Sequence, residues 1–190
     1  MKKLSLRMLA PLLLFALCAA PYAAATTLMR MTLAQLARSA DTIARVRCVS
    51  SAGQWDNCAI WTFSEFEVVE RFKGAPPNRI RVRVPGGRVG HLMATIEATP
   101  KFLAGKESVL FLETTPAGDY SVTAWVEGTF RIDVHPQTTR EAVTQESSSF
   151  LVFDAATRSF RAEGIRNLAF GEFRQRLAAA LAQPARGAQR

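Results

Sequence analysis

Two neighbouring segments of this chain alternate apolar and charged residues with a period of two. Segment 59–72 reads AIWTFSEFEVVERF, and segment 79–84 reads RIRVRV. The residues between them, KGAPPN, contain the glycine and the prolines of a chain reversal. Because a period of two fits a half-buried strand and not a helix, the two segments predict a β-hairpin within a mainly β fold.

The arginines of the second strand have a structural explanation in this hairpin. Arg79, Arg81 and Arg83 share one face, and Glu65 and Glu67 share the matching face of the first strand. We expect Glu67 to face Arg81 and Glu65 to face Arg83. Opposite charges that face each other across strands contribute about 0.2–1 kcal/mol per pair. The apolar pairs of the same register are Phe66 with Val82 and Val68 with Ile80.

The alternative is an anion-binding surface formed by Arg79, Arg81, Arg83 and Arg88. A surface that binds single-stranded nucleic acid typically has arginines without facing carboxylates and adds aromatic side chains for base stacking. Loss of residues 1–25, which carry three basic and no acidic residues, lowers the net charge from +8 to +5. A charge of this size indicates solubility. We therefore expect the paired arrangement and no nucleic-acid partner.

The N-terminal residues have the composition of a secretory signal peptide. Three basic residues lie within the first seven, an apolar run follows over 9–20, and AAA at 23–25 suits signal peptidase. We expect cleavage after position 25 and export to the periplasm or the extracellular space. The apolar run is shorter than the ~20 residues of a membrane span. No later segment is longer and equally apolar, so we expect no span in the mature chain.

The mature chain keeps two cysteines, Cys48 and Cys58. In an oxidising compartment an even pair predicts a disulfide. Closing this short loop stabilises the fold by roughly 3 kcal/mol in the chain-entropy model. A metal site is the alternative, but the spacing is wider than C-x-x-C and neither histidine is close in sequence. We therefore expect a disulfide and no bound metal.

The remaining segments predict one domain over 26–182, followed by a flexible tail at 183–190. A short helix is expected at 31–41 with Thr32 as its N-cap. A strand over 42–51 leads into a turn-rich loop, SAGQWDN. The later segments predict strands at 88–98, 108–114 and 120–133, an exposed polar stretch at 135–149, a hairpin at 149–164 and a helix at 167–183.

Three short motifs carry a resemblance to a known fold. They are AD-x-I at 40–43, V-x-x-x-x-K-G ending at 73–74, and GKESVLFL at 105–112. The region 38–131 resembles the netrin-like fold, an OB-type barrel best known from the tissue inhibitors of metalloproteinases, and a group of secreted bacterial proteins of this layout. The resemblance implies a small OB-like antiparallel barrel with a short N-terminal helix, a late β-hairpin and a C-terminal helix.

The chemistry of the animal inhibitors depends on a cysteine at the mature N-terminus, which chelates the zinc of the protease. In this chain the expected mature N-terminus is Thr26, and Cys48 lies well inside the sequence. A metalloprotease-inhibitor-like protein that lacks the N-terminal cysteine is therefore one alternative function. An OB-type nucleic-acid binder is the other.

The sequence contains none of the common catalytic motifs that a small secreted enzyme would use. G-x-S-x-G, H-E-x-x-H and the phosphate-binding glycine loop are all missing. His91 and His135 have no neighbouring nucleophile and carboxylate in sequence. We therefore expect no catalytic residues and no cofactor.

Aromatic residues offer a better indication of function. Trp55 and Asp56 lie in the predicted loop 49–57, where a tryptophan can act as a binding hot spot. The other interpretation is a tryptophan folded over the end of the barrel. Our leading hypothesis is an exported, non-catalytic module that binds a protein or another envelope component through Trp55 and Asp56.

Overall fold

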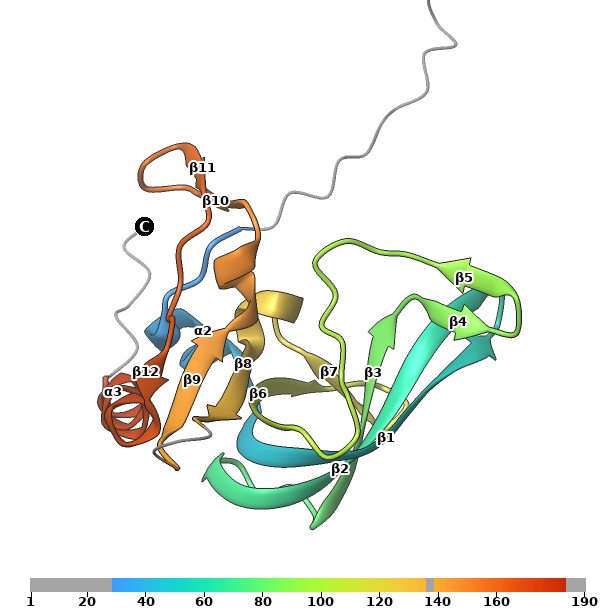
Figure 1. Cartoon of the computed structure of the whole chain (residues 1–190), viewed down its shortest axis with the longest axis horizontal. Coiled ribbons are helices and arrows are strands. Elements are labelled where there is room, and N and C mark those ends of the chain that lie inside the picture. The colour runs from blue at the N-terminus through green and yellow to red at the C-terminus, as the bar shows by residue number, and fades with distance from the viewer. Residues whose placement is uncertain (1–28, 136–138, 184–190) are drawn as a thin grey trace, which may run out of the picture.

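The computed structural model describes residues 29–135 and 139–183 (Figure 1). The predicted signal peptide and positions 184–190 of the predicted tail lie outside the described residues. Strands dominate and helices flank them, as the sequence predicts. The helices are α2 (Leu33–Ser39), α3 (Phe170–Ala182) and the 3-10 helices η2 (Trp125–Gly128) and η3 (Glu146–Ser149). The strands are β1 (Thr42–Asp56), β2 (Ala59–Lys73), β3 (Arg79–Pro85), β4 (Gly87–Val89), β5 (Leu92–Ala94), β6 (Glu107–Thr114), β7 (Tyr120–Val122), β8 (Thr129–Val134), β9 (Glu141–Gln145), β10 (Val152–Asp154), β11 (Ser159–Arg161) and β12 (Leu168–Ala169).

Five of these strands pair in a closed ring. The order is β1, β2, β3, β7 and β6, and β6 pairs with β1 from Thr42↔Leu112 to Arg47↔Glu107. All these pairs are antiparallel except β3 with β7, which is parallel. Strands β8, β9 and β12 extend the sheet beyond β6. Closure leaves the five ring strands without a free edge along their paired length.

Strands β2 and β3 form the predicted hairpin, but their register differs from the prediction by two residues. Glu67 pairs with Arg79 and Glu65 pairs with Arg81. The predicted pairs are wrong because the connection between the strands is two residues shorter than expected. The Val68 amide donates to the Asn78 carbonyl at 2.8 Å, whereas the predicted partner of Val68 was Ile80. A shift of two keeps each side chain on its predicted face. Phe66 thus packs opposite Ile80, and Val82 lies opposite Ser64.

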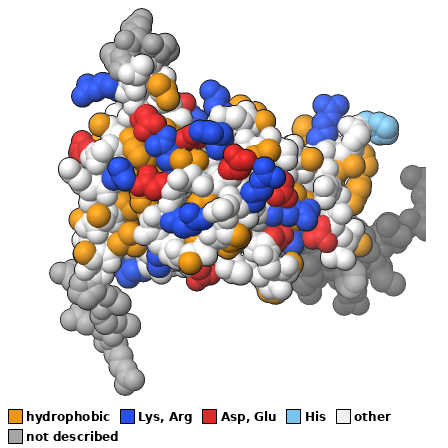
Figure 2. Space-filling view, turned by 90° about the horizontal axis from the view of Figure 1, so that it is seen from below, with side chains coloured by type: hydrophobic (Ala, Val, Ile, Leu, Met, Phe, Trp, Pro, Cys, Tyr) orange, Lys and Arg blue, Asp and Glu red, His pale blue; other side chains and the backbone are white. Residues whose placement is uncertain are grey.

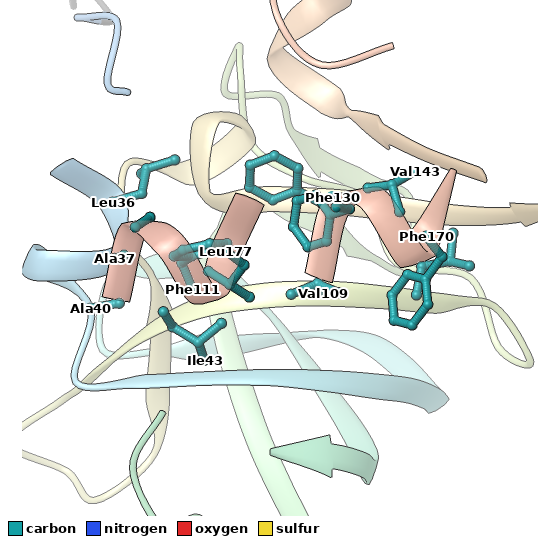
Figure 3. Close-up of a cluster of buried hydrophobic side chains, with 13 residues drawn as sticks. Leu36, Ala37, Ala40, Ile43, Val109, Phe111, Phe130, Val143, Phe170 and Leu177 are labelled. Atoms are coloured by element: carbon teal, nitrogen blue, oxygen red, sulfur yellow. The ribbon is translucent and has the colours of Figure 1, made fainter. Parts of the chain in front are cut away.

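Two hydrophobic clusters form the core, and β6 separates them. Val109 and Phe111 of β6 point to one cluster, and Leu110 and Leu112 point to the other. Residues 108–112 of β6 are therefore covered on both faces. The cluster inside the ring contains Ala44, Val46, Cys48, Phe66, Ile80, Val82, Val84, Leu110, Leu112 and Val122. The cluster between the sheet and the helices, drawn in Figure 3, includes Leu36, Ile43, Val109, Phe111, Phe130, Val143, Phe170 and Leu177.

The two helices cover one side of the sheet. The Thr32 hydroxyl accepts from the Gln35 amide and caps α2, and the Thr32 amide donates to the Gln35 side-chain oxygen, which completes a capping box. In α3 the side chains of Phe173 and Leu177 are buried against the sheet. The apolar stripe of the C-terminal helix therefore packs on the protein's own core.

The predicted loop SAGQWDN is strand for most of its length. Strand β1 continues through Asp56 and pairs with β2 to the end, with Trp55 opposite Ile60. The chain reverses at Asn57 and Cys58, and Asn57 has a φ of 53°. Asparagine tolerates this left-handed conformation, which a two-residue hairpin turn requires. Gly53 and Asn57 made this segment resemble a loop. The turn consists of Asn57 and Cys58 alone, and Gly53 lies within the paired strand.

Three later segments also differ from the prediction. Segment 88–98 is a hairpin, because Gly90 at φ 60° turns the chain between β4 and β5. Segment 120–133 is broken by η2, where Ala124 and Trp125 have positive φ. The polar stretch 135–149 contains β9, which pairs with β8 and buries Val143. The hairpin of β10 and β11 is as predicted.

Candidate functional site

The two cysteines are free thiols in the structure, one buried and one exposed. Cys48 lies opposite Phe66 in the β1–β2 ladder, whereas Cys58 lies in the turn at its end. The eight residue-to-residue steps of extended strand from Cys48 to Asp56 span on the order of 25 Å. A disulfide needs Cα atoms within about 7 Å. A Cys48–Cys58 bridge thus requires a different pairing of this hairpin, and it stays a prediction for thiol chemistry to test.

The arginines of β3 are paired with acidic side chains on the surface that we call the outer face, the solvent side of β2 and β3. Arg79 lies 3.1 Å from Glu67, and Arg81 lies 3.7 Å from Glu65. Arg83 is different because its side chain is only 17% exposed. Its partners come from the ends of two hairpins: Asp56 at 2.7 Å and Asp119 at 4.0 Å.

Two of these arginines lie over aromatic rings of β2. The Arg83 guanidinium lies 4.1 Å from the ring centre of Trp61, and the Arg81 guanidinium lies 4.0 Å from that of Phe63. Such cation–π contacts contribute about 0.5–1 kcal/mol at exposed sites. The sequence analysis missed them. The signal was present, because Trp61 and Phe63 have the same strand parity as Glu65 and Glu67.

The outer face has no excess of positive charge. Arg79, Arg81 and Arg83 meet Glu65, Glu67, Asp56 and Asp119, which is three cations against four carboxylates. Figure 2 shows basic and acidic side chains interspersed in the same way over the face seen from below. Arg88 belongs to β4 and lies outside this set. The four predicted anion-binding arginines are therefore divided between two surfaces.

The predicted binding pair, Trp55 and Asp56, is also divided. Asp56 points to the outer face, where it pairs with Arg83. Trp55 points to the opposite side, because successive strand residues alternate. This is the side covered by β4: a Cβ on Gly53 would lie 2.3 Å from the Arg88 carbonyl oxygen. The Trp55 side chain still has 53% of its surface exposed.

Exposed apolar side chains gather beside Trp55. Leu92 and Met93 of β5 are 53% and 72% exposed. We call Trp55, Leu92 and Met93 the hairpin end. In Figure 2 hydrophobic side chains gather at the right-hand end, where Figure 1 places β4 and β5. Exposed apolar side chains that gather at one end of a protein are typical of interaction sites.

A groove of about 240 Å³ lies beneath the β4–β5 hairpin. One wall consists of Val84 and Pro85 at the end of β3, and the other consists of Ala94 and Ile96. Phe102 completes the groove and packs edge-to-face on Phe66, with ring centres 5.0 Å apart. Two cations, Arg88 and Lys101, also line it.

A second, smaller hollow contains the most strongly perturbed carboxyl group. Burial raises the pKa of Glu146 to about 7, and the nearby charge of Arg131 offsets only part of this effect. Lys101, Lys106 and the Cys48 thiol line the same hollow. Burial also raises the pKa of Cys48, so this thiol stays protonated and is a poor nucleophile near neutral pH.

A charge network connects the sheet with the start of α3. The Arg45 guanidinium donates to Glu107 at 2.6 Å and to Glu141 at 2.5 Å, and it lies 4.7 Å from the ring centre of Phe170. Burial works against ionisation of Glu107, but hydrogen bonds from Arg47 and Arg45 outweigh it and lower the pKa of Glu107. Each charged side chain of this network is therefore paired with another side chain of the protein.

Comparison with known proteins gives no family assignment. No family model matches the chain, and a search of curated proteins finds no match either. Among residues 29–135 and 139–183, no three His, Cys, Asp or Glu side chains lie close enough together to hold a metal ion. The helices of the same residues are too short or too polar to span a membrane.

Proposed function

We propose that this protein is an exported, non-catalytic binding module that contacts its partner through the hairpin end. The observation that carries the proposal is that Trp55 of the β1–β2 hairpin and Leu92 and Met93 of the β4–β5 hairpin packed on it are all more than half exposed. Tryptophan is among the residues that dominate binding energy at interfaces. Export rests on the N-terminal sequence 1–25.

The hairpin end is held against the ring, which suits a binding surface. The close approach of Gly53 to Arg88 leaves no space for a side chain between β1 and β4. The Thr62 hydroxyl donates to the Gly86 carbonyl at 2.8 Å, which joins β2 to the start of the β4–β5 segment. A surface that is ordered before binding loses less conformational entropy on association.

The absence of catalysis is part of the proposal. Cys48 is kept as a thiol by burial, and Glu65 and Glu67 are engaged by arginines. We further propose that the five-stranded ring is an OB-like barrel. The closed order β1–β2–β3–β7–β6 with five strands supports this assignment.

A nucleic-acid binder is the second candidate, and one observation favours it. OB-folds bind oligonucleotides on the face of their second and third strands, and the outer face offers Trp61 and Phe63 there. Both rings are covered by arginines, however, and the nearby carboxylates cancel the positive charge. We therefore rank this function below partner binding at the hairpin end.

The test is capture of partners from the native envelope fraction with the exported protein as bait. Trp55→Ala should remove the partner or weaken its capture at least tenfold, because truncation of a hot spot costs 2 kcal/mol or more, roughly. Leu151→Ala is the matched control, since Leu151 is also exposed but lies outside the hairpin end. Equal capture by the Trp55 variant and the wild type would contradict the proposal. Metalloproteases among the captured proteins would favour the inhibitor alternative.

A further inference from the structure

We propose that the groove beneath the β4–β5 hairpin binds an amphiphile with an anionic head and a single acyl chain. The inference rests on the proposed function, because it names the chemical class of ligand at the same end of the ring. Three features of the groove carry it: a fixed apolar wall, a size that suits one chain, and two cations without carboxylate partners.

The apolar lining is formed before any ligand arrives. Val84 belongs to the ring core and Phe102 is fixed by its contact with Phe66. Opposite them, Ile96 remains 39% exposed, although it lies over an apolar surface. A methylene chain in this groove removes apolar surface from water on both sides at once. Each buried methylene contributes about 0.8 kcal/mol, which is about a fourfold gain in affinity.

The size of the groove limits what it can hold. Sites that enclose a whole small molecule typically measure about 300–1,000 Å³, and this groove measures about 240 Å³. It therefore accepts one narrow chain and leaves the rest of the ligand outside. This division suits a molecule with an apolar tail and a hydrated head.

The charge of the lining indicates the sign of the head. Among the described residues, Arg88 and Lys101 have no carboxylate within 4.0 Å, and the Arg88 Nε donates only to the Gly90 carbonyl. In contrast, Arg79, Arg81 and Arg83 all have acidic partners. Segment 86–106 contains three basic residues and one acidic residue, Glu97. A carboxylate or phosphate head would complete charge pairs with Arg88 and Lys101, whereas a cationic head would be repelled.

The experiment uses the exported protein, with its N-terminus determined by mass spectrometry, and titration calorimetry below the critical micelle concentration. Dodecanoate should bind with a stoichiometry of one. Hexanoate should bind more weakly, by about fourfold for each buried methylene that it lacks. Dodecyltrimethylammonium, which has the same chain and the opposite charge, should bind at least tenfold more weakly. Equal binding of the two dodecyl probes, or no binding of dodecanoate, would overturn the proposal.

Variants locate the site. Ala94→Phe should fill the groove and abolish binding, and Thr95→Phe provides a second filled groove if the first variant does not fold. Arg88→Gln combined with Lys101→Gln should remove the preference for dodecanoate over the cationic probe, whereas Arg79→Gln should leave it intact. Unchanged binding by a folded groove-filling variant would place the ligand elsewhere and refute the assignment.

The outcome for the groove is separate from the outcome for the proposed function. If dodecanoate fails to bind but Trp55-dependent capture of an envelope protein persists, the amphiphile assignment is wrong and the binding module stands. If dodecanoate binds in the groove and no Trp55-dependent partner is captured, the amphiphile assignment stands and the role of Trp55 is wrong.

Discussion

The buried carboxyl group of Glu146 makes the stability of this protein depend on pH in a defined window. Its pKa is about 7 in the folded protein, compared with 4.5 for an unperturbed carboxyl. The folded state therefore holds the proton more tightly than the unfolded state. The stabilisation is fully present below pH 4.5 and is lost as the pH rises through 7. Glu146→Gln should remove this dependence, because glutamine remains neutral throughout.

The magnitude follows from the two pKa values. One pKa unit corresponds to about 1.4 kcal/mol, so the full effect is about 3.4 kcal/mol, and about 2.5 kcal/mol of it falls between pH 5 and pH 8. Between pH 5 and pH 8, the free energy of unfolding of Glu146→Gln relative to the wild type should therefore increase by about 2.5 kcal/mol. Burial of Glu127 also raises the pKa of that residue, but its contribution cancels in the comparison.

Urea denaturation at pH 5, 6, 7 and 8 measures this difference. Glu113→Gln is the matched control, because it removes the same charge from an exposed position on β6. Its difference curve should stay flat within about 0.5 kcal/mol, in keeping with a surface substitution. A curve for Glu146→Gln that is equally flat would refute the argument from burial. A curve that rises in the opposite direction would show that the carboxylate is stabilised by Arg131 and the nearby lysines.

Further predictions follow from the hairpins. The exported protein, which lacks Cys18, should expose one reactive thiol, Cys58, when native and two when unfolded; a titration that finds none in the unfolded monomer would establish the Cys48–Cys58 disulfide and refute the observed pairing. Gly53→Ala should displace β4, because its Cβ would meet the Arg88 carbonyl, and should speed proteolysis within 87–94. Arg83→Lys should destabilise by about 1–2 kcal/mol through lost stacking on Trp61 and the lost hydrogen bond to Asp56, measured by urea denaturation with Arg79→Lys near zero. A fluorescent single-strand titration at two salt concentrations should show only weak binding, since charges on the outer face cancel.

Period-two patterns predicted the ring strands well because one face of each strand is buried. The parity of Arg79, Arg81 and Arg83 against Glu65 and Glu67 was confirmed, since a shift of two residues leaves faces unchanged. The register itself depends on the hydrogen bond from Val68 to Asn78, which closes the turn. Sequence alone gave no measure of how tightly KGAPPN would turn.

Short strands and tight turns were the elements that sequence reasoning missed. Glycine and asparagine in SAGQWDN indicated a loop, yet only Asn57 and Cys58 form the turn. The same reasoning overlooked Gly90, which makes a hairpin of segment 88–98. Both errors concern the hairpin end, so Trp55 was correctly selected as exposed but was given the wrong neighbours. Its actual neighbours come from β4 and β5, which lie more than 30 residues away in sequence.

The cations of the groove show why a binding site of this kind cannot be read from composition. In the sequence, Arg88 follows Arg79, Arg81 and Arg83 beyond a Pro-Gly-Gly turn, and composition alone does not indicate which of the four has an acidic partner. The distinction arises only when the fold assigns carboxylates to the first three and leaves Arg88 and Lys101 in the lining of an apolar groove. An arginine opposite a glutamate mainly stabilises a sheet, whereas an arginine without an acidic partner remains able to bind an anion. Separate substitution of Arg79 and Arg88 therefore tests the structural and the ligand-binding roles independently.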